Sequence, residues 1–349
     1  ETGPDLEAKY LKMAFFAQLV EQSKIGYDTA AAVYDDNSKT IVNSNSLVAA
    51  AHGRGLKVLL DFVPSHTSDR HPWFVESRSS RNSPKRDWYV WHHGKPGGGE
   101  PNNWISEFSG PAWTFDETTG QYYLHIYLRQ QPALNWRNPE VRAEMLNVMR
   151  FWFDRGVDGF RIDAVEHLTP DSEFRDNPAN PDWTPELGPA RSLFRTFSSH
   201  QPDGYEIVRA MRAVADEYPN RALVGEAYGT LEEVVAYYGP ELDGFQLPFN
   251  FALIGAPWDA QHIADEIERY EGALPPGAWP NWVLGNHDRS RVASRHGEAE
   301  ARTAAMLLLT LRGTPTIYQG EELGMTDGVV PPEAVQDPFE INVPGHGLG

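Results

Sequence analysis

Short apolar segments alternate with longer helical patterns through the middle and C-terminal parts of this chain, and the alternation recurs about six times. A parallel strand can follow another only after a long crossover, which is usually a helix. The rhythm therefore predicts an α/β fold in which a closed barrel of parallel strands is favoured and an open parallel sheet is the alternative. The apolar segments are KVLLDFV from Lys57, GFRIDAV from Gly159, RALVGEAY from Arg221, GFQLPFN from Gly244, NWVLGNHD from Asn281 and TPTIYQG from Thr314.

Helix signals lie between these segments. Asn138 and Pro139 are typical of an N-cap and a first-turn proline, and Gly156 ends the helix that they begin. The pattern gives no sign of a break between two domains. Further helices are expected over residues 46–55, 204–218, 260–274 and 298–313, and residues 1–22 have the pattern of one amphipathic helix.

Composition excludes several classes of protein. The formal net charge of -19 disfavours nucleic acid and anionic membrane surfaces as partners. The chain has no cysteine, which excludes disulfides and thiolate metal sites, and no apolar run reaches the length of a membrane span. The N-terminus lacks the pattern of a signal peptide. We therefore expect a soluble, cytoplasmic protein with no nucleic acid or membrane partner, and its oligomeric state stays open.

One long segment interrupts the alternation. Between His66 and about Arg137 the chain is rich in Trp, Gly, Pro and Asn, and QYYLHIYL from Gln121 is strand-like. A connection of this length is either functional or a small domain, and after a strand it would stand over the mouth of a barrel. The expected organisation is an N-terminal part of the barrel over residues 1–66, an inserted domain over 67–137 and the remainder of the barrel over 138–349.

Polar side chains gather at the C-terminal ends of the predicted strands. Because the C-terminal ends of barrel strands share one mouth, these side chains should converge there. Carboxylates are costly to bury without partners, and acids in different surroundings suit the acid and nucleophile chemistry of glycosidic-bond cleavage. The residues are Asp61 and His66 after one strand, Arg161 and Asp163 at the next, Glu226 at a third, and Asn286, His287 and Asp288 at a fourth.

Each feature alone also has a structural interpretation. Arg161 with Asp163 could be an ion pair within a strand, Glu226 could cap a following helix, and His66 could be a structural histidine. The residues from Asn286 to Asp288 could form a turn that bonds its own backbone. Joint occurrence at four successive strand ends favours the functional interpretation.

The same segments carry a family resemblance. DFVPSHTS, GFRIDAVEH, LVGEAY and LGNHDRSR resemble the four ordered signature regions of glycoside hydrolase family 13, the alpha-amylase superfamily. SDRHPWFVESRSS, PKRDWYVW, QPALNWRNPEVR and GTPTIYQGEELGM are similar to its bacterial alpha-glucosidase and oligo-1,6-glucosidase branch. The resemblance runs from about Gly26 to the end of the chain. It implies a TIM (β/α)8-type barrel with a small domain B after strand 3, here incomplete at the N-terminus and without the family's C-terminal domain.

The resemblance also implies a role for each matched residue. Asp163 is expected to be the nucleophile, Glu226 the general acid/base and Asp288 the third carboxylate, which stabilises the transition state. Arg161 would orient the nucleophile. The remaining residues implied in substrate binding are Tyr27, which stacks on the sugar, His66 and His287, which bind its hydroxyls, and Arg291, the pocket arginine.

Some positions depart from the family pattern. Lys24 stands where the family has a sugar-gripping aspartate, Ser65 replaces the usual Asn, and Ala133 occupies a usually polar position. The family's metal-binding loop is not recognisable, so no metal and no cofactor are expected. Ala164 after the nucleophile is similar to the alpha-1,4-active enzymes.

The function implied is that of a retaining alpha-glucosidase acting on terminal alpha-1,4-linked, or also alpha-1,6-linked, glucose of oligosaccharides or disaccharides. Two alternatives stay open: an alpha-glucosyl transferase or isomerase of the same family, and a catalytically impaired glucosidase-like module.

Overall fold

The computed structural model describes residues 32–35, 40–345 and 347, and the chain forms two compact units. Of the described residues, unit 1 comprises those up to Phe62, Val148–Asp163 and Val208–Gly328, and unit 2 comprises Val63–Asn147, Ala164–Ile207 and those from Val329 onward. The helix expected over residues 1–22, together with Lys24 and Tyr27, lies outside the described residues.

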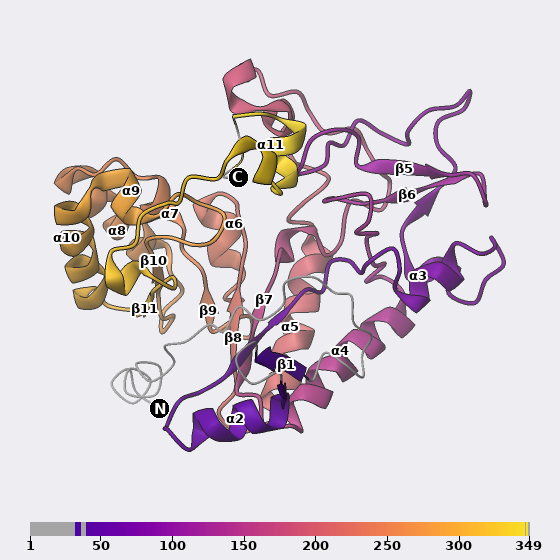
Figure 1. Ribbon diagram of the computed structural model, residues 1–349. Coiled ribbons are helices and arrows are strands. Elements are labelled where there is room, and N and C mark those ends of the chain that lie inside the picture. The colour runs from indigo at the N-terminus through magenta and orange to yellow at the C-terminus, as the bar shows by residue number, and fades with distance from the viewer. Residues whose placement is uncertain (1–31, 36–39, 346, 348–349) are drawn as a thin grey trace. The chain divides into compact units, whose positions relative to one another are not determined.

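Parallel strands form the centre of unit 1, and every predicted strand is present (Figure 1). A four-stranded sheet has the order β3-β7-β8-β9, a second sheet pairs β10 with β11, and a parallel bridge between Asn250 and Trp282 links the two. The strands therefore follow one another across the sheet in chain order. Their bounds are β3 Leu59–Phe62, β7 Gly159–Ile162, β8 Ala222–Gly225, β9 Leu247–Pro248, β10 Asn281–Val283 and β11 Thr314–Thr316, and an antiparallel pair precedes them, β1 Ala32–Asp35 with β2 Thr40–Asn43.

Helices connect these strands, as the sequence pattern predicts. The Asn138 side chain accepts a hydrogen bond from the Glu140 amide at 2.9 Å, which caps α4, and Gly156 after that helix has φ +89°. The Asp259 side chain caps α8 through two backbone amides. The bounds are α2 Ser44–His52, α4 Pro139–Phe153, α5 Pro202–Asp216, α6 Leu231–Ala236, α7 Ala252–Gly255, α8 Ala260–Ala273, α9 Val292–His296 and α10 Glu298–Thr310.

Close packing between strands sets the position of β7, which carries Arg161. A Cβ atom on Gly159 would lie 2.2 Å from the carbonyl oxygen of Ala222, so only glycine permits this approach of β7 to β8. Phe160 is 1% exposed, and its ring contacts Phe62 and Phe153 at centroid distances of 5.7 and 4.9 Å. The strand is thereby held rigidly beneath the polar residues that end it.

Unit 2 has little regular structure and an aromatic core. Its three-stranded antiparallel sheet has the order β4-β6-β5, and β6 confirms the strand expected from Gln121. The sheet packs on a cluster that includes Trp104 and Trp113. The elements of this unit are α3 Pro72–Ser77, β4 Trp91–His92, β5 Trp113–Asp116, β6 Gln121–Leu124 and α11 Pro338–Asn342, with 3-10 turns at Arg86–Trp88, Val165–His167, Pro185–Leu187, Pro189–Arg191 and Pro332–Ala334.

The α/β class and the parallel order of the strands are thus confirmed. Within the described residues the ladders end at β3 on one edge and at β11 on the other, so closure into a barrel stays a prediction. None of the helices in this part of the chain is long and apolar enough to cross a membrane.

Candidate active site

Arg161 is the centre of a cluster of carboxylates at the C-terminal end of the sheet in unit 1. It lies on β7 directly opposite Asp61 on β3. Its Nη1 donates to both carboxylate oxygens of Asp61, at 2.9 and 3.0 Å, and to Oδ1 of Asp163 at 2.5 Å. Its Nη2 donates to Oε2 of Glu226. One guanidinium therefore joins the ends of three neighbouring strands.

Backbone hydrogen bonds fix the main-chain positions of two residues that carry these carboxylates. The Asp163 amide donates to the Phe62 carbonyl at 2.9 Å, and the Glu226 amide donates to the Ile162 carbonyl at 2.8 Å. Both residues continue the ladders of β7 and β8 by one step. Their side chains are consequently placed by the sheet and not by a loose loop, which favours a fixed catalytic geometry.

The electrostatics of the cluster follow from burial and opposite charge. Arg161 is 8% exposed and Glu226 is 5% exposed. Burial alone would lower the pKa of Arg161, but the carboxylates of Glu226, Asp163 and Asp61 outweigh it and raise that pKa. Burial raises the pKa of Asp61 in spite of the attraction of Arg161. The arginine thus stays charged, while the carboxylates compete for one cation.

The loop after β10 brings His287 and Asp288 to this region. The Asn286 side chain accepts a hydrogen bond from the Asp288 amide at 3.2 Å, so the turn that bonds its own backbone is also present. Nε2 of His287 lies 3.3 Å from Oδ1 of Asp288. Burial is the largest influence on the pKa of Asp61, Arg161 acts against it, and His287 contributes weakly in the same direction as Arg161.

Tyr228 connects the Glu226 side of the cluster with Asp288. Its hydroxyl lies 3.0 Å from Nδ2 of Asn286, which donates to it, and 3.5 Å from Oδ2 of Asp288. Burial raises the pKa of Tyr228, and the carboxylates of Glu226 and Asp288 raise it further. The phenol therefore stays neutral and able to donate a hydrogen bond beside two carboxylates.

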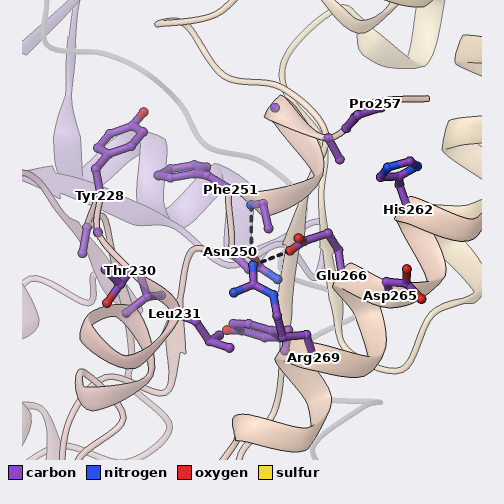
Figure 2. A pocket seen from close by; sticks show the side chains of 17 residues that line it. Tyr228, Thr230, Leu231, Asn250, Phe251, Pro257, His262, Asp265, Glu266 and Arg269 are labelled. Atoms are coloured by element: carbon purple, nitrogen blue, oxygen red, sulfur yellow. Dashed lines mark hydrogen bonds and ion pairs between the residues drawn. The ribbon is translucent and has the colours of Figure 1, made fainter. Parts of the chain in front are cut away.

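A cavity of about 610 Å³ opens beside Tyr228 (Figure 2). The rings of Tyr228 and Phe251 are stacked along one side of it, with centroids 4.7 Å apart and an interplanar angle of 20°. Polar side chains of α8 line the opposite side, where Glu266 and Arg269 form an ion pair at 2.6 Å. The cavity thus has an aromatic wall and a charged wall.

Other predicted site residues have different surroundings. His66 belongs to unit 2, where its Nδ1 lies 2.8 Å from Ser65 Oγ and its Nε2 lies 2.9 Å from Gln131 Nε2. The Arg291 side chain donates to the Gln319 carbonyl at 2.8 Å and packs over the ring of Tyr318, with 4.8 Å between guanidinium and centroid. Tyr27 lies outside the described residues. Arg161, Asp163, Glu226, His287 and Asp288 are therefore the predicted residues that share the unit 1 site.

Two further residues belong to the site: Asp61, which was expected at the strand ends but was given no role, and Tyr228, which was not predicted. Asp61 occurs in an otherwise apolar strand and is paired with Arg161, and a carboxylate within such a strand was the available signal. Tyr228 lies two residues beyond Glu226, where an aromatic residue at a strand end carries no distinctive signal. The capping interpretation of Glu226 is wrong, because Thr230 caps α6 with a complete capping box.

The site has no arrangement typical of a metal centre. Among residues 32–35, 40–345 and 347, no group of three or more His, Cys, Asp or Glu side chains could hold a metal ion. The carboxylates of the cluster face Arg161 instead, and a guanidinium occupies the place that a cation would need.

Comparison with known proteins identifies the family. The family model described as the alpha amylase catalytic domain matches residues 10–344. The chain belongs to the alpha-amylase family. The match begins upstream of Gly26, where the recognisable sequence motifs start. Family membership agrees with the resemblance carried by the four strand-end segments.

Individual relatives lie in the glucosidase branch. The chain is similar to a probable alpha-glucosidase of Rhizobium meliloti (strain 1021), with 42% identity over 332 residues that cover 90% of this chain and 60% of that protein. It is similar to an oligo-1,6-glucosidase of Halalkalibacterium halodurans, with 36% identity over 310 residues that cover 84% of this chain and 54% of that protein. The chain therefore spans between half and two thirds of the length of these relatives.

A solved structure also matches this alpha-amylase-family chain. The crystal structure of an alpha-glucosyl transfer enzyme, XgtA, superposes with a TM-score of 0.84 at 37% identity. The superposition covers 91% of this chain and 62% of that one. Hydrolases and a glucosyl transferase are thus both among its relatives.

Proposed function

We propose that this chain carries the catalytic site of a retaining alpha-glucosidase that removes terminal alpha-1,4-linked, or also alpha-1,6-linked, glucose from disaccharides and short oligosaccharides. The observation that supports this most directly is the bridging of Asp163 and Glu226 by the two terminal nitrogens of Arg161. A retaining enzyme needs two carboxyl groups roughly 5 to 5.5 Å apart, and a shared guanidinium favours such a short separation.

The proposed first step uses both carboxyl groups. An oxygen of the Asp163 carboxylate attacks the anomeric carbon while the bond from that carbon to the leaving oxygen breaks. The proton of the Glu226 carboxylic acid passes to the leaving oxygen, which departs as a hydroxyl of the released sugar. A covalent glucosyl ester on Asp163 and an ionised Glu226 remain.

The second step reverses these roles. Glu226 accepts a proton from water, the water oxygen attacks the anomeric carbon, and the bond to Asp163 breaks. Two inversions release alpha-glucose. Of the three carboxyl side chains on Arg161, that of Glu226 is the least exposed, at 7% against 23% for Asp163 and 26% for Asp61. Glu226 is thus the carboxyl group of the three that the fold shields best from water.

Asp288 and His287 would complete the subsite for the reacting glucose. A carboxylate accepts hydrogen bonds from sugar hydroxyls, and an imidazole donates or accepts them. Tyr228 lies against Asp288 and beside the cavity, which its stacked partner Phe251 also lines. For Tyr27, His66 and Arg291, a contact to the sugar rests on the family resemblance alone.

Family membership and the chain-order parallel sheet support a (β/α)8-type barrel with domain B inserted over residues 67–137. A glucosyl transferase is the second candidate, because the superposed XgtA is an alpha-glucosyl transfer enzyme.

Hydrolysis of p-nitrophenyl alpha-glucoside by the purified chain tests the proposal. We expect release of p-nitrophenol that disappears in the Asp163→Asn variant. A transferase would also release p-nitrophenol, but it would transfer most of the glucose to added maltose and not to water. Chromatography of the products would reveal this transfer. A folded chain that releases no p-nitrophenol and transfers no glucose would contradict both candidates and favour the impaired module.

A further inference from the structure

Arg295 on α9 donates hydrogen bonds to three backbone carbonyls. Its Nε lies 2.9 Å from the carbonyl oxygen of Ser290. Its Nη2 donates to the carbonyl of Leu284, and its Nη1 donates to the carbonyl of Ile254. Each guanidinium nitrogen of Arg295 thus donates to a main-chain oxygen, and Nη1 also lies 3.4 Å from Nε2 of His296, so the side chain holds backbone segments together.

The three carbonyls mark the loop that carries Asp288. Leu284 immediately precedes this loop and Ser290 lies at its end, so we define the Asp288 loop as residues 285–290. Ile254 belongs to α7, which follows β9. The planar guanidinium of Arg295 therefore joins both ends of the Asp288 loop to each other and to the neighbouring helix.

The position of Arg295 is electrostatically expensive. Burial lowers its pKa, the charge of Arg289 lowers it further, and the carboxylates of Glu321 and Asp327 act in the opposite direction. Burying a cation costs free energy unless hydrogen bonds and charges compensate it. The three carbonyl contacts at defined positions therefore point to a geometric role for Arg295.

Glu321 is a partly buried acid beneath the same loop, and its carboxylate acts on the pKa of Arg295. Its Oε2 accepts the Tyr318 amide at 3.0 Å, while its Oε1 has no hydrogen-bond partner among the described residues. A Cβ atom on Gly285 would lie 2.3 Å from that Oε1. The loop begins with glycine where it passes directly over the Glu321 carboxylate.

A second contact fixes the far end of the loop. Asp327 accepts hydrogen bonds from the Ser290 hydroxyl and from the Arg291 amide, the latter at 2.8 Å. The Asp327 amide in turn donates to Ser294 Oγ at 2.7 Å. Arg295 and Asp327 therefore hold both ends of the Asp288 loop, and these contacts restrict the positions that the Asp288 side chain can take.

We propose that Arg295 is a positioning residue for Asp288 and His287. It holds the Asp288 loop in the position from which these two side chains reach the sugar. This inference rests on the proposed glucosidase function for its effect on rate. Lysine cannot replace the arginine, because one ammonium cannot reach three carbonyls in different directions within one plane.

The experiment compares Arg295→Lys and Arg295→Ala with a matched control, Arg302→Lys. Arg302 is 81% exposed on α10 and pairs with Glu298 at 2.8 Å, so its replacement should leave activity unchanged. We expect kcat/KM for p-nitrophenyl alpha-glucoside to fall about 100-fold in Arg295→Lys, since displacement of a catalytic group by about 1 Å costs this much. Most of the loss should be in kcat, because the third carboxylate acts on the transition state.

Two readouts separate positioning from general stability. Guanidinium ion at millimolar concentration should restore part of kcat in Arg295→Ala, whereas ammonium at equal ionic strength should not. Amide hydrogen exchange should accelerate in peptides covering residues 284–291 of Arg295→Lys and remain unchanged in peptides covering β7 and β8.

The outcomes are distinct. Wild-type kcat in Arg295→Lys, with unchanged exchange over residues 284–291, would overturn the proposal. Loss of kcat with faster exchange throughout unit 1 and no rescue by guanidinium would also overturn it, since Arg295 would then be only structural. A folded wild-type chain without activity would remove the proposed function, while the exchange measurement would still decide whether Arg295 holds the loop.

Discussion

Nη1 of Arg161 lies 2.9 and 3.0 Å from the two carboxylate oxygens of Asp61, and the two residues are directly opposite each other on neighbouring parallel strands. The same Nη1 also donates to Asp163, and Nη2 donates to Glu226. Asp61 therefore holds the guanidinium in the orientation in which it reaches both proposed catalytic carboxyl groups.

Asp61→Asn should lower activity without lowering stability at neutral pH. The amide keeps the size of the side chain but removes one acceptor and one negative charge, so Arg161 can turn, and we expect kcat/KM to fall about tenfold or more. The pKa of Asp61 is raised in the folded state, so the folded chain binds this proton more tightly than the unfolded chain does. Ionisation of Asp61 therefore costs stability as pH rises above 3.8, and the variant avoids that cost.

Steady-state kinetics and thermal unfolding between pH 3.5 and pH 7 check this expectation. A variant that keeps wild-type kcat/KM would show that Asp61 does not orient Arg161. A variant that is less stable than the wild type at pH 7 would contradict the sign of the pKa shift.

Asp163→Asn and Glu226→Gln should each abolish turnover and leave the fold intact. The first removes the nucleophile and the second removes the proton donor, so we expect losses on the order of 1000-fold or more. Circular dichroism checks the fold, and Glu232→Gln on the exposed surface of α6 is the matched control for carboxyl-to-amide exchange. Near-normal rates in either variant would end the assignment.

The first product released should be alpha-glucose. Two successive inversions at the anomeric carbon preserve its configuration, and proton NMR within the first minutes records the anomer before mutarotation mixes the two forms. Beta-glucose as the early product would mean that water attacks directly and that Asp163 is not a nucleophile.

Asp158→Asn should destabilise unit 1 by about 2 kcal/mol or more, because it leaves buried charge-assisted hydrogen bonds unmade. The Asp158 side chain is 1% exposed and accepts from His52 at 2.6 Å, Lys57 at 2.9 Å and the Val58 amide at 2.9 Å. Burial would raise the pKa of Asp158, but these hydrogen bonds together lower it. The stabilisation is therefore complete above pH 3.8 and is lost as pH falls through the lower folded pKa.

Urea unfolding at pH 7 measures the effect. Asp154→Asn is the control, since Asp154 is exposed and accepts one hydrogen bond, from Tyr218 at 2.8 Å. Equal midpoints for the two variants would show that the buried hydrogen bonds of Asp158 add no net stability.

A buried charge cluster should give unit 2 its greatest stability in mildly acidic solution. Glu107 lies 2.5 Å from Arg195 and 3.3 Å from Nε2 of His167. Burial alone would raise the pKa of Glu107, but Arg195 and His167 lower it to about 2. Burial alone would lower the pKa of His167, but Glu107 and Glu166 raise it.

The two shifts act on opposite sides of the pH range. The contribution of Glu107 is complete above pH 4.5 and is lost as pH falls toward about 2. The contribution of His167 is complete below pH 6.5 and is lost as pH rises through its higher folded pKa. We expect Glu107→Gln to flatten the dependence of Tm on pH, with Glu173→Gln, whose side chain is 75% exposed, as the control. An identical pH profile in Glu107→Gln and the wild type would contradict the cluster's role.

Local patterns in the sequence were sufficient for the parallel strands, for the longer helices of the described residues and for the family, whereas the short helices α6, α7 and α9 were not predicted. The spacing of apolar residues predicted every strand of the parallel sheet. Strands and helices differ in the spacing of their apolar residues, and that spacing can be seen within a short stretch of sequence. The four strand-end segments carried Asp163, Glu226 and Asp288 in the order that the family requires.

Only the tertiary structure decided which of these side chains meet. Asp61 and Arg161 are separated by 100 residues, and their pairing depends on the register between β3 and β7, which short-range patterns do not encode. The same applies to Tyr228, which reaches Asp288 across 60 residues, and to Arg295, which holds the Asp288 loop through backbone carbonyls. Carbonyl groups are identical in every residue, so a contact to them leaves no trace in the sequence and exists only once the chain has folded.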